Sequence, residues 1–406
     1  MIRLLVDSGK EVFRGGRLYW GWMGGLLLVV LLGVYCYAVQ TDYGMLVATG
    51  LSEEVAWGIY IGNFAYLIGI AAAAVMLVIP AYIFNNEEIK KVVMLGEAMA
   101  IVACIMAVMF ILASLGRPDR LWHILPVLGT INLPRSMLAW DVIVINSYLL
   151  INIVLLSYML NNNYWGREPQ FRIYFLGVIA AIVLAISIHI VTAFLFSSNV
   201  SRPYWHTAIL GPRFLASAFT SGPALLILTL QVIHAKTSYK VTGTVIETLA
   251  IIMTATLQIN MLLLGIEVYT EFYSQTRHAS SIQYLFFGLK GHAALVPWIW
   301  TSIVLNMIAV TTLSIHALRR NRNILLTCCL LTLVGIWMEK GMGLVIPGFI
   351  PSPLGDIVEY VPTLVEIGVC FGIWAFGAML FTVILKMVIP IEAGVLRGRV
   401  VRMRTA

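Results

Sequence analysis

The chain has 406 residues, of which 60% are hydrophobic and only 11% are charged. Soluble domains carry about 25% charged residues, so this composition excludes a water-soluble globular protein and predicts an integral membrane protein along almost its whole length. The formal net charge of +7 comes from basic residues that flank the apolar segments, so it does not indicate binding to nucleic acid.

Ten segments are long and apolar enough to span a membrane as helices, because a backbone in lipid must satisfy its polar groups internally. We predict them at residues 18–40, 55–84, 92–115, 138–160, 173–198, 213–236, 244–272, 294–318, 323–345 and 360–388. Pro80, Pro223 and Pro297 predict a kink or a helix end in three of them. The predicted fold is a single all-α polytopic membrane domain over residues 1–406.

Basic residues are distributed unevenly between the two sides of the predicted membrane region. Most Lys and Arg residues fall at the two termini and in short connections on the same side, such as NNEEIK and TSYKVTG. Cytoplasmic loops carry such an excess, so we predict that both termini are cytoplasmic. The outer connections at 116–137, 199–212 and 273–293 are longer and rich in Pro, Trp, His and Arg, which suits a docking surface.

The spacing of cysteine and histidine argues against a metal or a haem in this chain. All five cysteines lie in apolar runs, without a CxxC or CxxCH pattern, which is typical of small buried side chains. Haem b within a membrane usually needs paired axial histidines, and His189 is the one histidine deep within a predicted helix. We therefore expect no haem, no iron–sulfur cluster and no metal site in the chain itself.

Asp141 stands out among the polar residues of the predicted helices, because it interrupts the apolar run LAWDVIVIN. A carboxylate at mid-bilayer costs about 2.5–3.5 kcal/mol. Tyr148 and Asn152 follow it by seven and eleven residues, which places all three on one helix face at about 100° per residue. Such a stripe is expected to face the interior of the bundle or a cavity.

Polar groups of other predicted helices also lie in the outer half of the membrane. They are Trp57, Tyr60 and Asn63 on the second helix, His189 on the fifth, Asn260 and Glu267 on the seventh, Glu339 on the ninth and Glu366 on the tenth. Their shared depth favours one polar cavity near the outer face. Several separate hydrogen bonds between helices are the alternative explanation.

Glu97 and Glu247 are exceptions, because they lie in the cytoplasmic half, and they allow two interpretations. Together with Asn152, Glu267, Glu339 and Glu366 they form a candidate proton path across the membrane. Alternatively, they pair with lysines at the interface, which needs no transport. Those lysines are Lys90, Lys91, Lys236 and Lys240.

The outer polar groups suit a quinone head group, which needs a titratable donor or acceptor near each ring oxygen. His189, Asp141 and Tyr60 provide such groups. A proton- or ion-coupled transporter is the alternative function, because intramembrane carboxylates also serve in transport. The residues alone leave both functions open.

Four stretches carry a family resemblance that covers the predicted helices most densely between residues 57 and 226. They read WGIYIGNFAYLIGIAAAA, SLGRPDRLWHILP, PRSMLAWDVIVINSYLLIN and SIHIVTAFLFSSNVSRPYWHTAILGPRFLASAFTSGPALL. The chain resembles the NrfD, or polysulfide-reductase membrane-subunit (PsrC-like), family. Within this family it is most similar to the membrane subunit of the DsrMKJOP complex, which is associated with sulfite reduction.

The resemblance implies two packed four-helix bundles plus two extra helices, in the cell membrane, with a menaquinone pocket near the outer surface. It also implies a ferredoxin-like iron–sulfur partner (DsrO-like) docked over that pocket, and the other subunits of a DsrMKJOP-like complex. The expected function is electron exchange between menaquinol and this partner in dissimilatory sulfur metabolism.

The site residues that follow from the resemblance fall on segments of the second, fourth and fifth helices and on one outer loop. His189 and Asp141 are the expected catalytic proton acceptors. The expected quinone-binding residues are Trp57, Tyr60, Asn63, Arg117, Trp140 and Tyr148.

Overall fold

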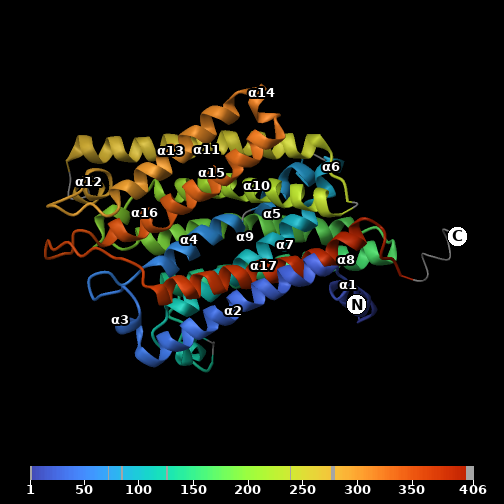
Figure 1. The fold of residues 1–406 in the computed structure, drawn as a ribbon, viewed down its shortest axis with the longest axis horizontal. Helices are drawn as coiled ribbons and strands as arrows, with labels where there is room; N and C mark the ends of the chain where they lie inside the picture. The colour runs from blue at the N-terminus through green and yellow to red at the C-terminus, as the bar shows by residue number, and fades with distance from the viewer. Residues whose placement is uncertain are drawn as a thin grey trace.

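The computed structural model describes residues 2–71, 73–83, 86–124, 127–237, 239–275 and 279–398. Ten of its helical segments are long and apolar enough to cross a membrane, and they run side by side along the long axis of the molecule (Figure 1). Within the described ranges no strand is present, and an isolated β-bridge joins Leu289 and His292. The predicted all-α fold with ten spans is confirmed, and the chain is a multi-pass membrane protein.

The spanning segments follow the predicted ranges at most ends. They are α2 (Arg17–Tyr43), α4 with α5 and η1 (Ile59–Ala71, Ala73–Val78 and Ile79–Ile83), α7 (Val93–Ser114), α8 (Met137–Trp165), α9 (Phe171–Ser197), α10 (Leu210–Lys236), α11 (Gly243–Ser274), α13 (Val296–Ser314), α15 with α16 and η4 (Arg322–Lys340, Met342–Val345 and Ile346–Phe349) and α17 (Leu364–Glu392). Ala72 and Phe84, which fall in the predicted range 55–84, lie outside the described residues.

Short helices precede the first span or lie between the spans. They are α1 (Ile2–Val12), α3 (Met45–Ala48), α6 (Glu87–Lys90), η2 (Pro118–Ile124), η3 (Pro203–Trp205), α12 (Ala279–Phe287) and α14 (His316–Arg319). Figure 1 shows α1 and α6 at one end of the molecule and α3 and α12 at the other. We name these ends the terminal face and the loop face. That the terminal face is cytoplasmic stays a prediction from the sequence.

The spans form two bundles and a flanking pair. In the first bundle α4 packs on α7 and α9, and α8 packs on α7 and α9; in the second, α10 packs on α11 and α15, and α13 packs on α11 and α15. Contacts of α10 with α4, α5 and α9 join the two bundles, while α2 and α17 pair beside α7 (Figure 1). This arrangement is the two four-helix bundles plus two extra helices that the resemblance implied.

Two of the spans are interrupted. Pro80 lies in the π-helical segment η1, where the wider turn accommodates a proline ring. The range predicted as a helix at 323–345 breaks at Gly341, between α15 and α16. Gly62 of α4 packs on this break, because a Cβ added to Gly62 would lie only 3.1 Å from the Gly341 Cα atom. Pro297 opens α13, whereas α10 continues past Pro223.

Candidate functional site

A polar pocket of about 260 Å³ lies at the loop face, where the end of α2 meets η2. Gln40, Arg117 and Asp119 are its main polar lining. Arg117 binds Asp119 through two hydrogen bonds, Nε to Oδ1 at 2.9 Å and Nη2 to Oδ2 at 2.8 Å. The Arg117 guanidinium holds the pKa of Asp119 below its usual value. Asp119 is therefore a carboxylate at neutral pH and a weak proton acceptor.

Tyr60 lies directly behind this pocket. Its hydroxyl donates a hydrogen bond of 2.6 Å to Gln40 Oε1, and Gln40 Nε2 donates one of 2.8 Å to the Ala113 carbonyl. Both side chains are almost fully buried, so Gln40 connects the pocket to the interior of the first bundle. Gln40 was not among the residues predicted from the sequence, although an amide near the end of an otherwise apolar helix was the available signal.

Asn63, one turn along α4, is held by two tryptophans. Trp337 of α15 and Trp374 of α17 both donate their indole N–H to Asn63 Oδ1, at 3.1 Å and 2.9 Å. Asn63 Nδ2 donates to the Ile59 carbonyl at 2.9 Å. The amide therefore ties three helices together and does not line the polar pocket.

Asp141 of α8 and His189 of α9 lie outside this pocket, with Asp141 against α9 and His189 near Ile68 of α4. The Thr192 hydroxyl donates a 2.8 Å hydrogen bond to Asp141 Oδ1, whereas Oδ2 finds no partner among the described residues. His189 Nδ1 lies 2.6 Å from the Ala185 carbonyl, and Nε2 is likewise unpartnered in the part of the chain that is described. Buried polar atoms without a partner are rare, so these two mark a place for a water molecule or a mobile proton.

The other residues of the α8 stripe have their donors satisfied. The Tyr148 hydroxyl donates to the Ala71 carbonyl at 2.8 Å, and Asn152 Nδ2 donates to the Tyr148 carbonyl at 2.7 Å. Trp140 points away from the stripe, and its indole N–H donates to the Pro134 carbonyl at 3.0 Å. The stripe thus faces the bundle interior, with Asp141 as the member that keeps an unpartnered atom.

Trp57 belongs to an aromatic cluster that closes the loop end of the first bundle. It stacks on Trp205 with ring centroids 5.3 Å apart and meets Phe196 and Phe349 edge to face. The Trp205 indole N–H donates to the Leu344 carbonyl at 2.8 Å. These rings pack against one another, so Trp57 acts as a wall between the two bundles at this level.

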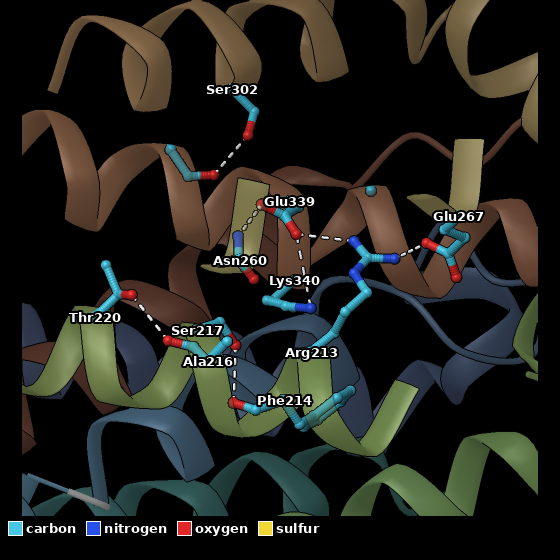
Figure 2. A network of polar contacts seen from close by, with 12 residues as sticks. Arg213, Phe214, Ala216, Ser217, Thr220, Asn260, Glu267, Ser302, Glu339 and Lys340 are labelled. Atoms are coloured by element: carbon cyan, nitrogen blue, oxygen red, sulfur yellow. Dashed lines mark hydrogen bonds and ion pairs between the residues drawn. The ribbon is translucent and has the colours of Figure 1, made fainter. Parts of the chain in front are cut away.

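The second bundle holds a buried charge network (Figure 2). Arg213 of α10 forms ion pairs with Glu267 of α11 and, at 2.8 Å, with Glu339 of α15. Asn260 donates to Glu339 Oε2 at 3.0 Å, and Lys340 Nζ lies 3.6 Å from Glu339 Oε1. All five side chains are buried. Two cations balance two carboxylates here, which is the arrangement that makes buried charge tolerable.

This network reaches water at the loop face. Glu267 also lines a pocket of about 370 Å³, together with Thr207, Thr270 and Glu271. Glu267 and Glu339 were predicted from the sequence, whereas Arg213 and Lys340 were not expected in the site, and both are buried beside these carboxylates. The available signal was that both positions fall within predicted helices.

Glu366 organises the loop face rather than lining a cavity. Its Oε2 accepts hydrogen bonds from the Gly50 and Thr363 backbone N–H groups at 2.8 Å and 2.9 Å, and Oε1 accepts from the Tyr360 hydroxyl at 2.5 Å. The same hydroxyl accepts from the Ile59 N–H at 3.1 Å. This chain of contacts fixes the point where α4 begins.

Near the terminal face, Glu97 is buried in α7, and neither of its carboxylate oxygens has a partner within the described ranges. The lysines considered for it lie elsewhere, because Lys90 pairs with Glu87 at 2.5 Å and Lys91 pairs with Glu88 at 2.7 Å. Glu97 is therefore a second place where a buried carboxyl group has no fixed hydrogen bond.

Glu247 differs from Glu97 in both burial and partners. It lies at the surface of the terminal face and pairs with Arg320 at 3.1 Å and with His316 at 3.5 Å. Lys240 instead donates to the His234 carbonyl. Of the six residues of the candidate proton path, the structure brings Glu267 and Glu339 together at Arg213. Glu97, Asn152, Glu247 and Glu366 have other partners or none among the described residues.

Comparisons with known proteins place the chain in a family. The profile of the family described as "Polysulphide reductase, NrfD" matches residues 47–350. The chain is 24% identical over 404 residues to the membrane subunit of a putative dimethyl sulfoxide reductase of Halobacterium salinarum, covering 90% of both chains. It is 22% identical over 408 residues to a selenate reductase subunit of Mesobacillus selenatarsenatis, covering 89% of this chain and 92% of the relative. It is also 27% identical over 261 residues to an Hdr-like menaquinol oxidoreductase integral membrane subunit of Archaeoglobus fulgidus, covering 64% of this chain and 62% of the relative.

Proposed function

Because the chain belongs to the NrfD polysulphide reductase family and has ten candidate spans, we propose that it is the quinone-interacting membrane subunit of a reductase complex. The observation that carries this proposal is the polar pocket at Gln40 and Arg117, with the Tyr60–Gln40 hydrogen bond as its inner wall. The Archaeoglobus fulgidus relative is described as a menaquinol oxidoreductase subunit, so menaquinol is the substrate that we propose.

The pocket fits the head group of a quinol, which supplies two electrons and two protons when it is oxidised. Arg117 provides hydrogen-bond donors that would hold one ring oxygen. The Gln40 N–H groups already bind the Ala113 carbonyl and Met45 Sδ, so Gln40 would act through Oε1, which accepts one hydrogen bond from Tyr60 and can accept another from a quinol hydroxyl. Asp119 is paired with Arg117 and orients it. Asp141 and His189 do not line this pocket, so we assign to them onward acceptance of the protons rather than direct contact with the quinol. Their Oδ2 and Nε2 atoms are unpartnered among the described residues.

The electron acceptor would be a ferredoxin-like iron–sulfur subunit at the loop face, which this proposal takes as the outer face. The connections at 116–137, 199–212 and 273–293 form the docking surface, apart from residues 125–126 and 276–278, which lie outside the described residues. The more specific assignment is a DsrMKJOP-like complex with a DsrO-like partner. The family membership and the similarity to subunits of other reductases support the coarser part of this proposal.

Replacing Gln40 with leucine tests the head-group pocket. We expect the variant complex to bind a menaquinol analogue about fivefold to tenfold more weakly, because a hydrogen bond contributes about 1 kcal/mol. Thr41→Val is the matched control, since Thr41 lines the same pocket but donates its hydroxyl to backbone carbonyls of its own helix. Quinol titration of the purified complex measures both. A wild-type complex that does not pass electrons from quinol to its iron–sulfur partner would overturn the proposed function.

Glu97 and Glu247 are expected to differ in their effect on proton uptake from the terminal face. We expect Glu97→Gln to reduce proton uptake at least tenfold in proteoliposomes that turn over quinol, without loss of thermal stability, because a neutral amide is less costly to bury than a carboxylate. Glu247→Gln should change neither, since it removes a surface ion pair worth about 1 kcal/mol or less. A dye inside the vesicles reports the pH. Unchanged proton uptake in Glu97→Gln would show that Glu97 is structural.

A further inference from the structure

A second cavity beside the polar pocket is apolar and lies between α2, α7, η2 and α17. It measures about 520 Å³, within the range of about 300–1,000 Å³ that is usual for small-molecule sites. Val34 of α2, Leu112 of α7, Leu121 of η2 and Phe376 of α17 are among its walls. Its described lining contains no charged residue, and the Tyr37 hydroxyl is its main polar side-chain group.

The position of α2 against α17 leaves this cavity open toward lipid. The two helices touch at Gly33 and Gly372, where a Cβ added to Gly33 would lie 2.5 Å from the Gly372 Cα atom. Both glycines also line the cavity. Val34, the next residue of α2, is 59% exposed, so this side of the cavity faces the surrounding bilayer. A hydrocarbon chain can therefore enter from the membrane without crossing the core of a bundle.

The apolar cavity and the polar pocket meet end to end. Pro118 lines both of them, and Ala113 of the apolar cavity accepts the hydrogen bond from Gln40 of the polar pocket. Gln40 lies ten residues beyond Val30 on α2, so the two cavities together extend about 15 Å along the helix at about 1.5 Å per residue. One end can hold a polar ring and the other an attached hydrocarbon chain.

We propose that the apolar cavity binds the ring-proximal isoprenoid units of the quinone tail, while the head group occupies the pocket at Gln40 and Arg117. The inference rests on the proposed function and adds to it the part of the ligand that the extra helices α2 and α17 recognise. Two features of the cavity favour a quinone tail as its occupant. It is continuous with a polar pocket of head-group size, and its lining is predominantly hydrocarbon on every helix that borders it.

The test compares two quinones with the same head group, one with a long polyprenyl tail and one with a methyl group in its place. Val34→Trp fills the cavity from its lipid side. We expect it to weaken binding of the long-tailed quinone at least about tenfold, the factor for roughly two methylene groups that lose their contacts, and to leave the tail-less quinone unaffected. Leu28→Trp is the matched control, because Leu28 is 70% exposed on the same helix and lies about 120° around it from Val34.

The outcomes distinguish the inference from the function on which it rests. If the wild-type complex binds neither quinone, the proposed function fails. If it binds both and Val34→Trp binds the long-tailed quinone as tightly as wild type does, the tail lies elsewhere and the inference is overturned.

A crosslinking measurement on the unaltered complex covers the case in which Val34→Trp loses both quinones. A quinone with a diazirine on its first isoprenoid unit should label the segments that line the cavity, at residues 30–37, 109–113, 118–121 or 369–376. Labelling of any other segment, or labelling that an excess of phospholipid abolishes, would overturn the inference, the latter by showing a site for acyl chains only.

Discussion

Arg213→Gln should lower the free energy of unfolding by about 3–5 kcal/mol, the usual cost of removing one partner from a buried ion pair. The variant would leave Glu267 and Glu339 buried beside Lys340 alone, so that two carboxylates face one cation. The midpoint of thermal unfolding of the detergent-solubilised complex measures the loss. Arg320→Gln serves as the control, because it breaks an ion pair at the surface and should cost about 1 kcal/mol or less.

A second substitution tests whether charge balance is the cause. Arg213→Gln combined with Glu267→Gln leaves Glu339 and Lys340 as a balanced pair. We expect this double variant to recover part of the stability that Arg213→Gln loses, because neutralising a buried pair costs less than breaking it. If the double variant is less stable than the single one, the contribution of Arg213 is packing rather than charge.

Asp141→Asn should slow quinol oxidation about 100-fold while the complex still assembles. The magnitude follows from the loss of one group that takes part in proton transfer, for which factors of about 100 to 10,000 are typical. Assembly should survive because an asparagine oxygen can accept the Thr192 hydrogen bond as Asp141 Oδ1 does. Steady-state turnover with a quinol analogue measures the effect.

Asn146→Leu on the same helix provides the comparison for Asp141→Asn. Asn146 is exposed on α8 and donates to the Val142 carbonyl of its own helix, so its replacement should leave turnover within about twofold of wild type. Turnover of Asp141→Asn at the wild-type rate would remove Asp141 from the reaction and leave His189 as the remaining candidate acceptor.

The ten spans could be predicted because lipid imposes a simple condition on sequence: about 20 apolar residues in a helix. The break at Gly341 escaped prediction, since the range around it was apolar enough to pass for a continuous span and the first proline after it is Pro347. A glycine inside a helical pattern is tolerated often enough that it does not by itself predict an interruption.

The candidate site was predictable in part, for a related reason. Helical periodicity identifies which residues share a face, as it did for Asp141, Tyr148 and Asn152, but it does not say which neighbouring helix that face meets. The partners of Asn63, Trp337 and Trp374, lie 274 and 311 positions away in sequence. Polar residues at similar depth therefore looked like members of one cavity, while the structure distributes them among tertiary contacts that only the fold defines.

The contacts of Asn63 and Gly62 with α15 also restrict how the two bundles can move. Transporters that alternate access usually rock one bundle against another around a fixed site. Here such a rotation would have to pull Trp337 from Asn63 and separate Gly62 from Gly341, where two backbones are already in contact. The bundles are therefore held together at the loop end of α4. Coupling between a reaction in the first bundle and the buried charges of the second therefore has to use proton transfer and side-chain movement, while the two bundles keep their relative position.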